Sequence, residues 1–217
     1  MSEANRRPGD EAVRAAVLAA ADRLYYALGI QAVGMDALRA ETGVSLKRLY
    51  SLFPSKESIV EEVLHGRHRL WNDLVEDAVR AGGARQRLVA IYDMLARWFD
   101  QDDFRGCMFI NSFGELGATS PRIAEIVRAH KAQFQARLTE LVVEAGASSS
   151  LAAQLAILAE GAQTTAAIAG TSDAARQARA AAEVLIDAAL RDPDAESART
   201  APASTAPAST APTGTAS

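Results

Sequence analysis

Apolar residues recur along this chain at intervals of three and four positions, with polar residues between them. This period matches the 3.6 residues per turn of an α-helix, and the sequence has no alternating β-branched runs that would predict strands. The pattern therefore predicts an all-α fold. The first apolar stripe consists of Val13, Val17, Ala20, Leu24 and Leu28.

Glycine, proline and cap residues divide the chain into nine expected helices. They cover residues 10–28, 35–41, 45–52, 55–80, 85–100, 106–118, 121–145, 149–169 and 173–191. Gly29 is the stop signal of the first helix, and Gly43 supplies a left-handed turn before the third. Ser45 and Ser55 are N-cap candidates. Gly66 interrupts the fourth helix and marks a candidate hinge.

The last part of the chain has a different composition. From residue 192 onward Ala, Pro, Ser and Thr dominate, and "TAPAS" occurs twice in succession. Such a segment cannot bury enough apolar surface to offset its loss of conformational entropy. We therefore expect residues 192–217 to be a disordered tail, although a functional role remains an alternative.

Composition restricts the class of protein and its compartment. The 217 residues are 49% hydrophobic and 23% charged, and a single cysteine excludes an internal disulfide. The segment "MSEANRRPGDEA" lacks the apolar stretch of a signal peptide, and no run reaches the roughly 20 apolar residues that span a bilayer. We expect a cytoplasmic protein with no membrane partner.

Charge is distributed unevenly. The net charge is −4, yet Arg39, Lys47, Arg48 and Lys56 lie close together in the sequence and are opposed only by Glu41. This local excess of cations could meet phosphates, whereas the acidic remainder could not bind nucleic acid by bulk attraction. Any DNA contact is therefore expected at one end of the molecule.

Helix, glycine turn and helix over about 17 residues is the geometry of a helix-turn-helix, whose second helix enters the DNA major groove. Leu38, Val44, Leu49 and Phe53 are spaced to form its small core. The opposite face of the second helix carries Lys47, Arg48 and Ser51, with Tyr50 at its edge. A solvated basic helix fits the charge pattern equally well.

The segment "GVSLKRLYSLFPSKESIVEEVL", preceded by "MDALRAET", resembles the N-terminal DNA-binding domain of the TetR (tetracycline repressor) family of transcriptional regulators. The matching positions are Gly43, Val44, Ser45, Leu49, Tyr50, Phe53, Ser55, Lys56 and Glu57. The resemblance covers about residues 10 to 65. It implies DNA-binding residues Met35, Ser45, Leu46, Lys47, Arg48, Tyr50 and Lys56.

By this resemblance, Lys47 and Arg48 would read guanine edges, and Tyr50 would touch a phosphate or a thymine methyl group. Ser45, Lys56 and the backbone N–H of Met35 would meet phosphates.

Three positions depart from the family pattern. Leu46 stands where many members have lysine or glutamine and would pack on a thymine methyl group; Leu52 replaces Tyr or His. Arg39 replaces a small alanine and must extend outward or toward a phosphate.

The resemblance implies residues 1–54 as the helix-turn-helix DNA-binding domain, ordered from about residue 10, and residues 55–191 as a helical effector-binding and dimerisation domain. A homodimer would place two recognition helices on a palindromic operator. The expected dimer interface is Leu151, Leu155, Leu158, Ala162, Thr165, Ala178, Ala181 and Leu185. Packing within one subunit is the alternative for these residues.

Large adaptable side chains gather in the middle of the chain and predict a pocket for a small apolar or aromatic effector. The expected pocket residues are Trp71, Met94, Trp98, Phe99, Met108, Phe109, Asn111, Phe113, Glu115, His130, Phe134 and Gln163. A plain hydrophobic core explains the aromatic residues about as well. Asn111 and Glu115 lie one turn apart on an otherwise apolar helix, where a structural pair is the alternative to ligand contact.

The sequence thus predicts a non-enzymatic, ligand-released repressor with no cofactor and no metal, or alternatively a helical binding or scaffold protein without an operator. A catalytic triad of Ser112, Glu115 and His130 lacks a nucleophile motif. Glu61, His65 and His68 have a spacing that could bind metal, but a charged solvent face fits better.

Overall fold

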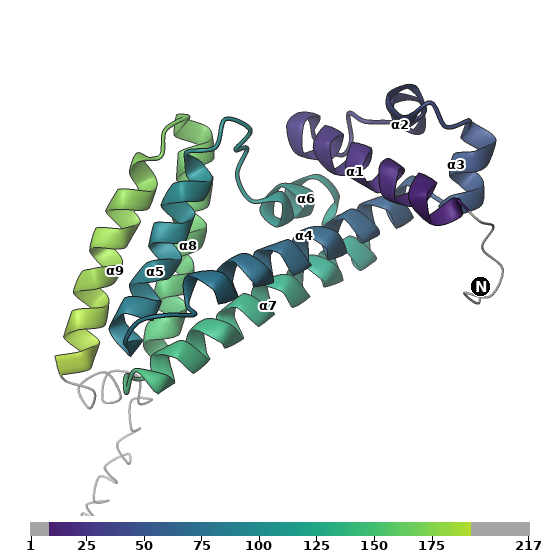
Figure 1. Ribbon diagram of the computed structural model, residues 1–217. Coiled ribbons are helices and arrows are strands. Elements are labelled where there is room, and N and C mark those ends of the chain that lie inside the picture. The colour runs from purple at the N-terminus through teal and green to yellow at the C-terminus, as the bar shows by residue number, and fades with distance from the viewer. Residues whose placement is uncertain (1–8, 192–217) are drawn as a thin grey trace, which may run out of the picture.

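The computed structural model describes residues 9–191, and the expected tail lies outside these residues. The described residues form nine α-helices and no strand, which confirms the all-α fold (Figure 1). The helices are α1 (Asp10–Leu28), α2 (Met35–Thr42), α3 (Leu46–Leu52), α4 (Lys56–Ala78), α5 (Ala84–Phe99), α6 (Met108–Leu116), α7 (Pro121–Glu144), α8 (Ser150–Ala169) and α9 (Asp173–Arg191).

The helix ends have the local chemistry that the sequence predicts. Gly43 ends α2 in the left-handed conformation, with φ at 68°. The side chain of Ser45 accepts a hydrogen bond from the backbone N–H of Arg48, at 3.3 Å, and so caps α3. Ser55 and Ser58 form a reciprocal capping box at the start of α4.

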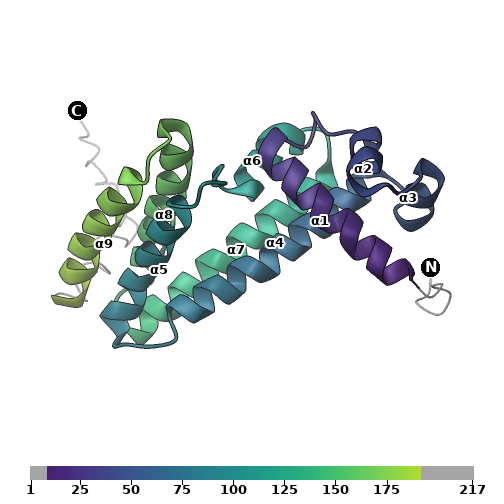
Figure 2. The ribbon, with the colours of Figure 1, turned by 45° about the horizontal axis from the view of Figure 1, so that its top comes forward.

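Helices α1, α2 and α3 form a small head at one end of the molecule, and α4 leads from it to the body (Figures 1 and 2). The head's core includes Leu38, Leu49 and Phe53, each fully buried. It continues into the first half of α4, the start of α6 and the start of α7. The expected boundary between residues 54 and 55 therefore does not coincide with a boundary between cores.

A second core lies at the other end, between α5, α8, α9 and the distal halves of α4 and α7. The hydroxyl of Tyr92 on α5 donates a hydrogen bond to the carbonyl of Leu155 on α8, at 2.8 Å. Two ion pairs also join α5 to α9. Arg85 pairs with Asp187, at 2.5 Å, and Arg179 pairs with Asp93, at 2.7 Å. These contacts join three helices into the body.

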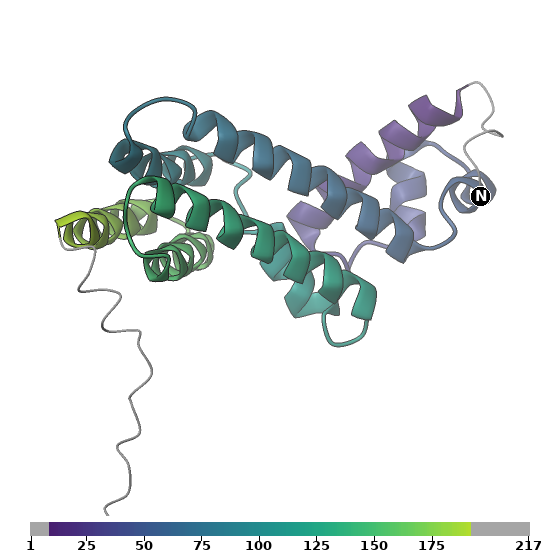
Figure 3. The same cartoon turned by 90° about the horizontal axis from the view of Figure 1, so that it is seen from below.

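Helices α4 and α7 run side by side in the same direction and connect the two cores (Figure 3). Their contacts keep one register along their length. From the head outward, they join Glu57 to Ser120, Glu61 to Arg122, His68 to His130 and Glu76 to Arg137. These side-chain contacts link α4 to α7 from the head to the second core.

Candidate DNA-binding surface and effector cavity

Helix α3, the expected recognition helix, presents one buried and one exposed side. Leu49 is completely buried in the head, whereas Lys47 is exposed and Tyr50 is 52% exposed. A capped start and a buried leucine fix the orientation of this short helix, so its outer side chains have a defined direction. Lys47 and Tyr50 are thus positioned to meet a ligand outside the head.

Arg48 lies differently from Lys47. Its guanidinium forms an ion pair with Asp10, the first residue of α1. Asp10 is only 8% exposed. Nearby, Arg14 of α1 donates a hydrogen bond to the carbonyl of Leu52, at 2.7 Å, and lies over the ring of Phe53, at 4.3 Å. The first turns of α1 therefore hold α3 and the residue after it in place, through the contacts of Asp10 with Arg48 and of Arg14 with Leu52 and Phe53.

The other expected DNA-binding residues lie at the edges of the head. Met35 begins α2 and, like Leu46, packs half-buried against the head's core. The ammonium group of Lys56 reaches the carbonyl of Gln31, at 3.5 Å. Burial lowers the pKa of Lys56, while the negative charge of Glu115 acts in the opposite direction.

A cavity of about 580 Å³ lies between α4, α5, the start of α6 and α7. Its lining contains six of the expected pocket residues, which are Trp71, Met94, Trp98, Met108, Phe109 and His130. The two tryptophan rings meet edge to face, with their centroids 5.7 Å apart. This volume falls within the range of about 300–1,000 Å³ that is typical of small-molecule sites.

The remaining expected pocket residues lie elsewhere. Phe99 and Phe134 are buried in the second core, and Phe113 is 44% exposed. The amide of Asn111 donates to the carbonyl of Arg105, at 3.1 Å. Gln163 is buried and donates to the carbonyl of Ala159, at 3.2 Å.

Glu115 joins the body to the head instead of lining the cavity. Its carboxylate accepts hydrogen bonds from the backbone N–H groups of Ile30, at 3.0 Å, and Gln31, at 2.7 Å. Gly29 allows this approach, because its φ is 87° and a Cβ atom there would lie 3.3 Å from the carboxylate. Glu115 therefore has structural partners in the turn after α1.

His130 is the most buried ionisable residue of the cavity, with 4% exposure. Its ring stacks on Phe109, with centroids 3.5 Å apart, and its Nδ1 lies 2.9 Å from Nδ1 of His68. Burial, followed by the charges of Lys131 and His68, lowers the pKa of His130 to about 3. The imidazole is therefore neutral at neutral pH.

The sequence analysis missed several residues that complete the cavity. They are Arg67, Leu70, Leu74, Asp77, Ala78, Arg97, Gln101 and Cys107. The positions on α4 share the face of Trp71 at three- and four-residue spacing, so the helical period could have identified them. Cys107 is buried, and its sulfur lies 3.7 Å from Nζ of Lys131.

The expected dimer residues divide between two environments. Leu151, Leu155, Ala162 and Ala178 are buried in the second core of the chain. Leu158 and Leu185 pack half-buried against the same core, whereas Thr165 and Ala181 are exposed.

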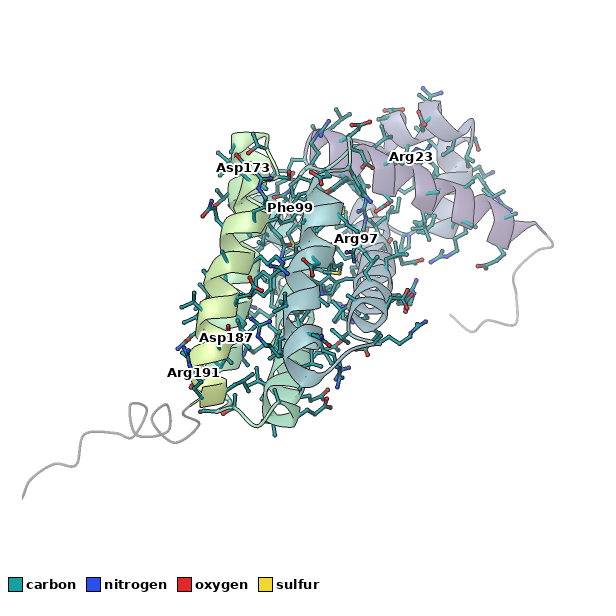
Figure 4. All side chains as sticks on the ribbon, turned by 60° about the vertical axis from the view of Figure 1, so that its left-hand side comes forward. Arg23, Arg97, Phe99, Asp173, Asp187 and Arg191 are labelled. Atoms are coloured by element: carbon teal, nitrogen blue, oxygen red, sulfur yellow. The ribbon has the colours of Figure 1, made fainter. Side chains whose placement is uncertain are left out.

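The outer face of α8 and α9 carries other apolar side chains. Ile157 is 72% exposed, Ile168 83% and Val184 68%. Figure 4 shows α9 along the outside of the body, with Asp173 at one end and Asp187 and Arg191 at the other.

The alternative sites of the sequence analysis are not assembled. Among residues 9–191 no three His, Cys, Asp or Glu side chains come together as a metal site. Ser112 is fully buried, and within the described chain its hydroxyl has no hydrogen-bond partner, while Glu115 and His130 have the other partners given above. None of the helices described is long and apolar enough to cross a membrane.

The short head, its capped recognition helix and the helical body define the class, a helix-turn-helix DNA-binding regulator. The model of the family described as "Bacterial regulatory proteins, tetR family" matches residues 17–63, and "Tetracyclin repressor-like, C-terminal domain" matches residues 84–182. The chain therefore belongs to the TetR family of transcriptional regulators. The comparison with curated proteins gives no match.

Solved structures of similar proteins agree with this assignment. A TetR-family regulator from Streptomyces coelicolor is 26% identical, with a TM-score of 0.73 over 84% of this chain and 96% of its own. A putative TetR regulator from Streptomyces avermitilis is 27% identical, with 0.72 over 82% and 97%. A TetR regulator from Chloroflexus aurantiacus has the same fold at 21% identity, with 0.75 over 83% and 97%.

Proposed function

We propose that this protein is a homodimeric repressor that binds a palindromic operator and is released by a small effector. The observation that carries the proposal is the recognition helix, which is capped by Ser45, anchored by Leu49 and exposed at Lys47 and Tyr50. Lysine in the major groove recognises guanine, and tyrosine contacts phosphate or thymine. Operator recognition is assigned first to these two exposed residues.

Arg48 has a different role in this proposal than Lys47. In the free protein its guanidinium is paired with Asp10, and base contact would require that ion pair to open or to be shared. We therefore assign Arg48 to positioning the recognition helix. Lys56 and the first turn of α2, which has no side-chain cap and begins at Met35, contact phosphates of the DNA backbone.

Dimerisation is assigned to the outer face of α8 and α9. Ile157, Ile168 and Val184 form an exposed apolar surface, and Gly161 and Ala181 leave room for close helix approach. The head lies at the opposite end of the molecule from this face (Figure 1). A two-fold axis here would present two recognition helices to half-sites about 34–36 Å apart.

Release is assigned to α4, which lines the cavity with Trp71 and begins just after the recognition helix. A ligand that binds one arrangement of α4 better than another shifts the population toward it. Because α7 follows α4 in a fixed register, the pair moves together and changes the separation of the two heads.

The test is DNA binding by fluorescence anisotropy, with the DNA upstream of the protein's own reading frame as the probe. Lys47→Glu should abolish specific binding, because a carboxylate replaces a cation in the groove. Arg80→Glu is the matched control, since it makes the same charge change at an exposed position beyond the far end of α4. Equal loss in both variants, or no loss in Lys47→Glu, would refute the proposal.

A further inference from the structure

The cavity carries one cation whose charge has no counter-ion. Arg67 is paired with Asp22, at 2.5 Å, and Asp77 is paired with Arg80. Arg97 is an exposed residue of α5 that lines the cavity, and it has no ion-pair partner among residues 9–191. Figure 4 shows it on the side of α5 that faces α4. The uncompensated charge of the cavity is therefore positive.

Asn72, His68 and His130 form a chain of hydrogen-bonding side chains, and the orientation of the Asn72 amide determines which ring nitrogens carry protons. Nδ2 of Asn72 lies 3.0 Å from Nε2 of His68, and because an amide nitrogen only donates, this Nε2 accepts. With this amide orientation the His68 proton is on Nδ1, from which it is donated to Nδ1 of His130. His130 consequently carries its own proton on Nε2.

This proton makes His130 a hydrogen-bond donor. Its Nε2 has no hydrogen-bond partner within the described part of the chain, and the residue lines the cavity. A neutral imidazole agrees with the burial that lowers the pKa of His130. Both Arg97 and His130 can therefore donate to an acceptor on a ligand, and the one carboxylate of the lining, Asp77, already has Arg80 as partner.

We propose that the effector is an amphiphilic anion, an aromatic ring system that carries a carboxylate. Its rings lie among Trp71, Trp98 and Phe109, and its carboxylate is attracted by Arg97 and supplies the acceptor. A cationic amphiphile of the same shape is disfavoured, because the one carboxylate of the lining, Asp77, is paired with Arg80 and the unpaired charge, Arg97, would repel it. This inference rests on the proposed function and specifies its ligand class.

The test uses three probes with one aromatic body: 2-naphthylacetate, 2-naphthylacetamide and 2-(2-naphthyl)ethylamine. Binding to the full-length protein is measured by calorimetry without DNA. The carboxylate should bind at least tenfold more tightly than the amide, and the amine should not bind. Arg97→Gln should weaken carboxylate binding at least tenfold and leave the amide unchanged, whereas Arg69→Gln, at an exposed position of α4 outside the lining, should change neither.

Failure of the carboxylate to bind at millimolar concentration, equal binding of amide and carboxylate, or binding of the amine would each overturn the ligand class. Long-range ¹H–¹⁵N spectra of the free protein at pH 7 test the proton assignment separately. They should show His130 protonated at Nε2, and protonation at Nδ1 would overturn that assignment. Anisotropy with operator DNA distinguishes the two proposals: carboxylate that binds without releasing DNA refutes ligand release and leaves the ligand class intact.

Discussion

Glu115 on α6 should contribute strongly to the attachment of the head to the body. Its carboxylate accepts two backbone N–H groups, from Ile30 at 3.0 Å and Gln31 at 2.7 Å. A hydrogen bond to a charged group contributes about 1.5–3 kcal/mol, with the smaller value suited to a half-buried carboxylate. We therefore expect Glu115→Ala to lower the free energy of unfolding by about 2–4 kcal/mol, and Glu115→Gln by about half as much, because one acceptor oxygen remains.

Urea denaturation gives the change in stability, and hydrogen exchange locates it. The amides of Ile30 and Gln31 should exchange faster in Glu115→Ala, while amides in the second core, such as that of Tyr92, should be affected less. Glu125→Ala is the control, since it removes a carboxylate that only pairs with exposed Arg122. A stability loss below about 0.5 kcal/mol for Glu115→Ala, or unchanged exchange at residues 30 and 31, would refute the reasoning.

Three further predictions concern the dimer face, the buried histidine and the glycine of α4. Ile168→Asp should weaken self-association by about 2–5 kcal/mol, because it places an unpaired charge in the interface; Val143→Asp, at an exposed position outside α8 and α9, should not, and sedimentation velocity compares the two. Because burial lowers the pKa of His130 to about 3, against an ordinary value near 6.5, its contribution to stability is complete above pH 6.5 and is lost as the pH falls toward 3; its C2–H resonance should not titrate between pH 8 and 5. Gly66→Ala should raise the melting temperature, because alanine favours a helix by about 1 kcal/mol and the added Cβ would meet only Arg69, at 3.9 Å; a lower melting temperature would contradict this.

Local signals were enough to predict the helices and the recognition element. Gly43 and Ser45 act through neighbouring backbone groups, so their roles can be read from a few consecutive residues. The buried positions Leu38 and Leu49 follow from helical spacing in the same way. These features depend on contacts between residues that lie close together in the sequence, within the head.

The face of α8 could not be chosen from its pattern. The helix is apolar on nearly all sides, with Leu151 and Leu155 on one and Ile157 and Ile168 on another. Periodicity shows which residues share a face, but which face meets α5 and α7 is decided by their packing. Leu151 and Leu155 pack into the core of the chain, and Ile157 and Ile168 are exposed.

Hydrogen-bond and ion-pair partners that are distant in sequence could not be predicted from the sequence pattern either. Glu115 was expected in a pocket because it is polar on an apolar helix, yet it bonds to the turn after α1. Arg48 was expected to face only DNA, and its pairing with Asp10 depends on how α1 crosses α3. Of the aromatic residues expected in a pocket, Trp71, Trp98 and Phe109 line the cavity, whereas Phe99 and Phe134 lie in the second core.

The way the head's core extends into other helices limits how this protein could be recombined with its relatives. Val60 and Leu64 of α4, and Ile123 and Val127 of α7, belong to the same core as the recognition helix. A chimera that exchanges only residues 1–54 would replace one side of this core and keep the other. Exchange of operator specificity between relatives should therefore succeed by transplanting the surface residues of α3, or by crossover points within α4 that carry matching substitutions in the first turns of α7.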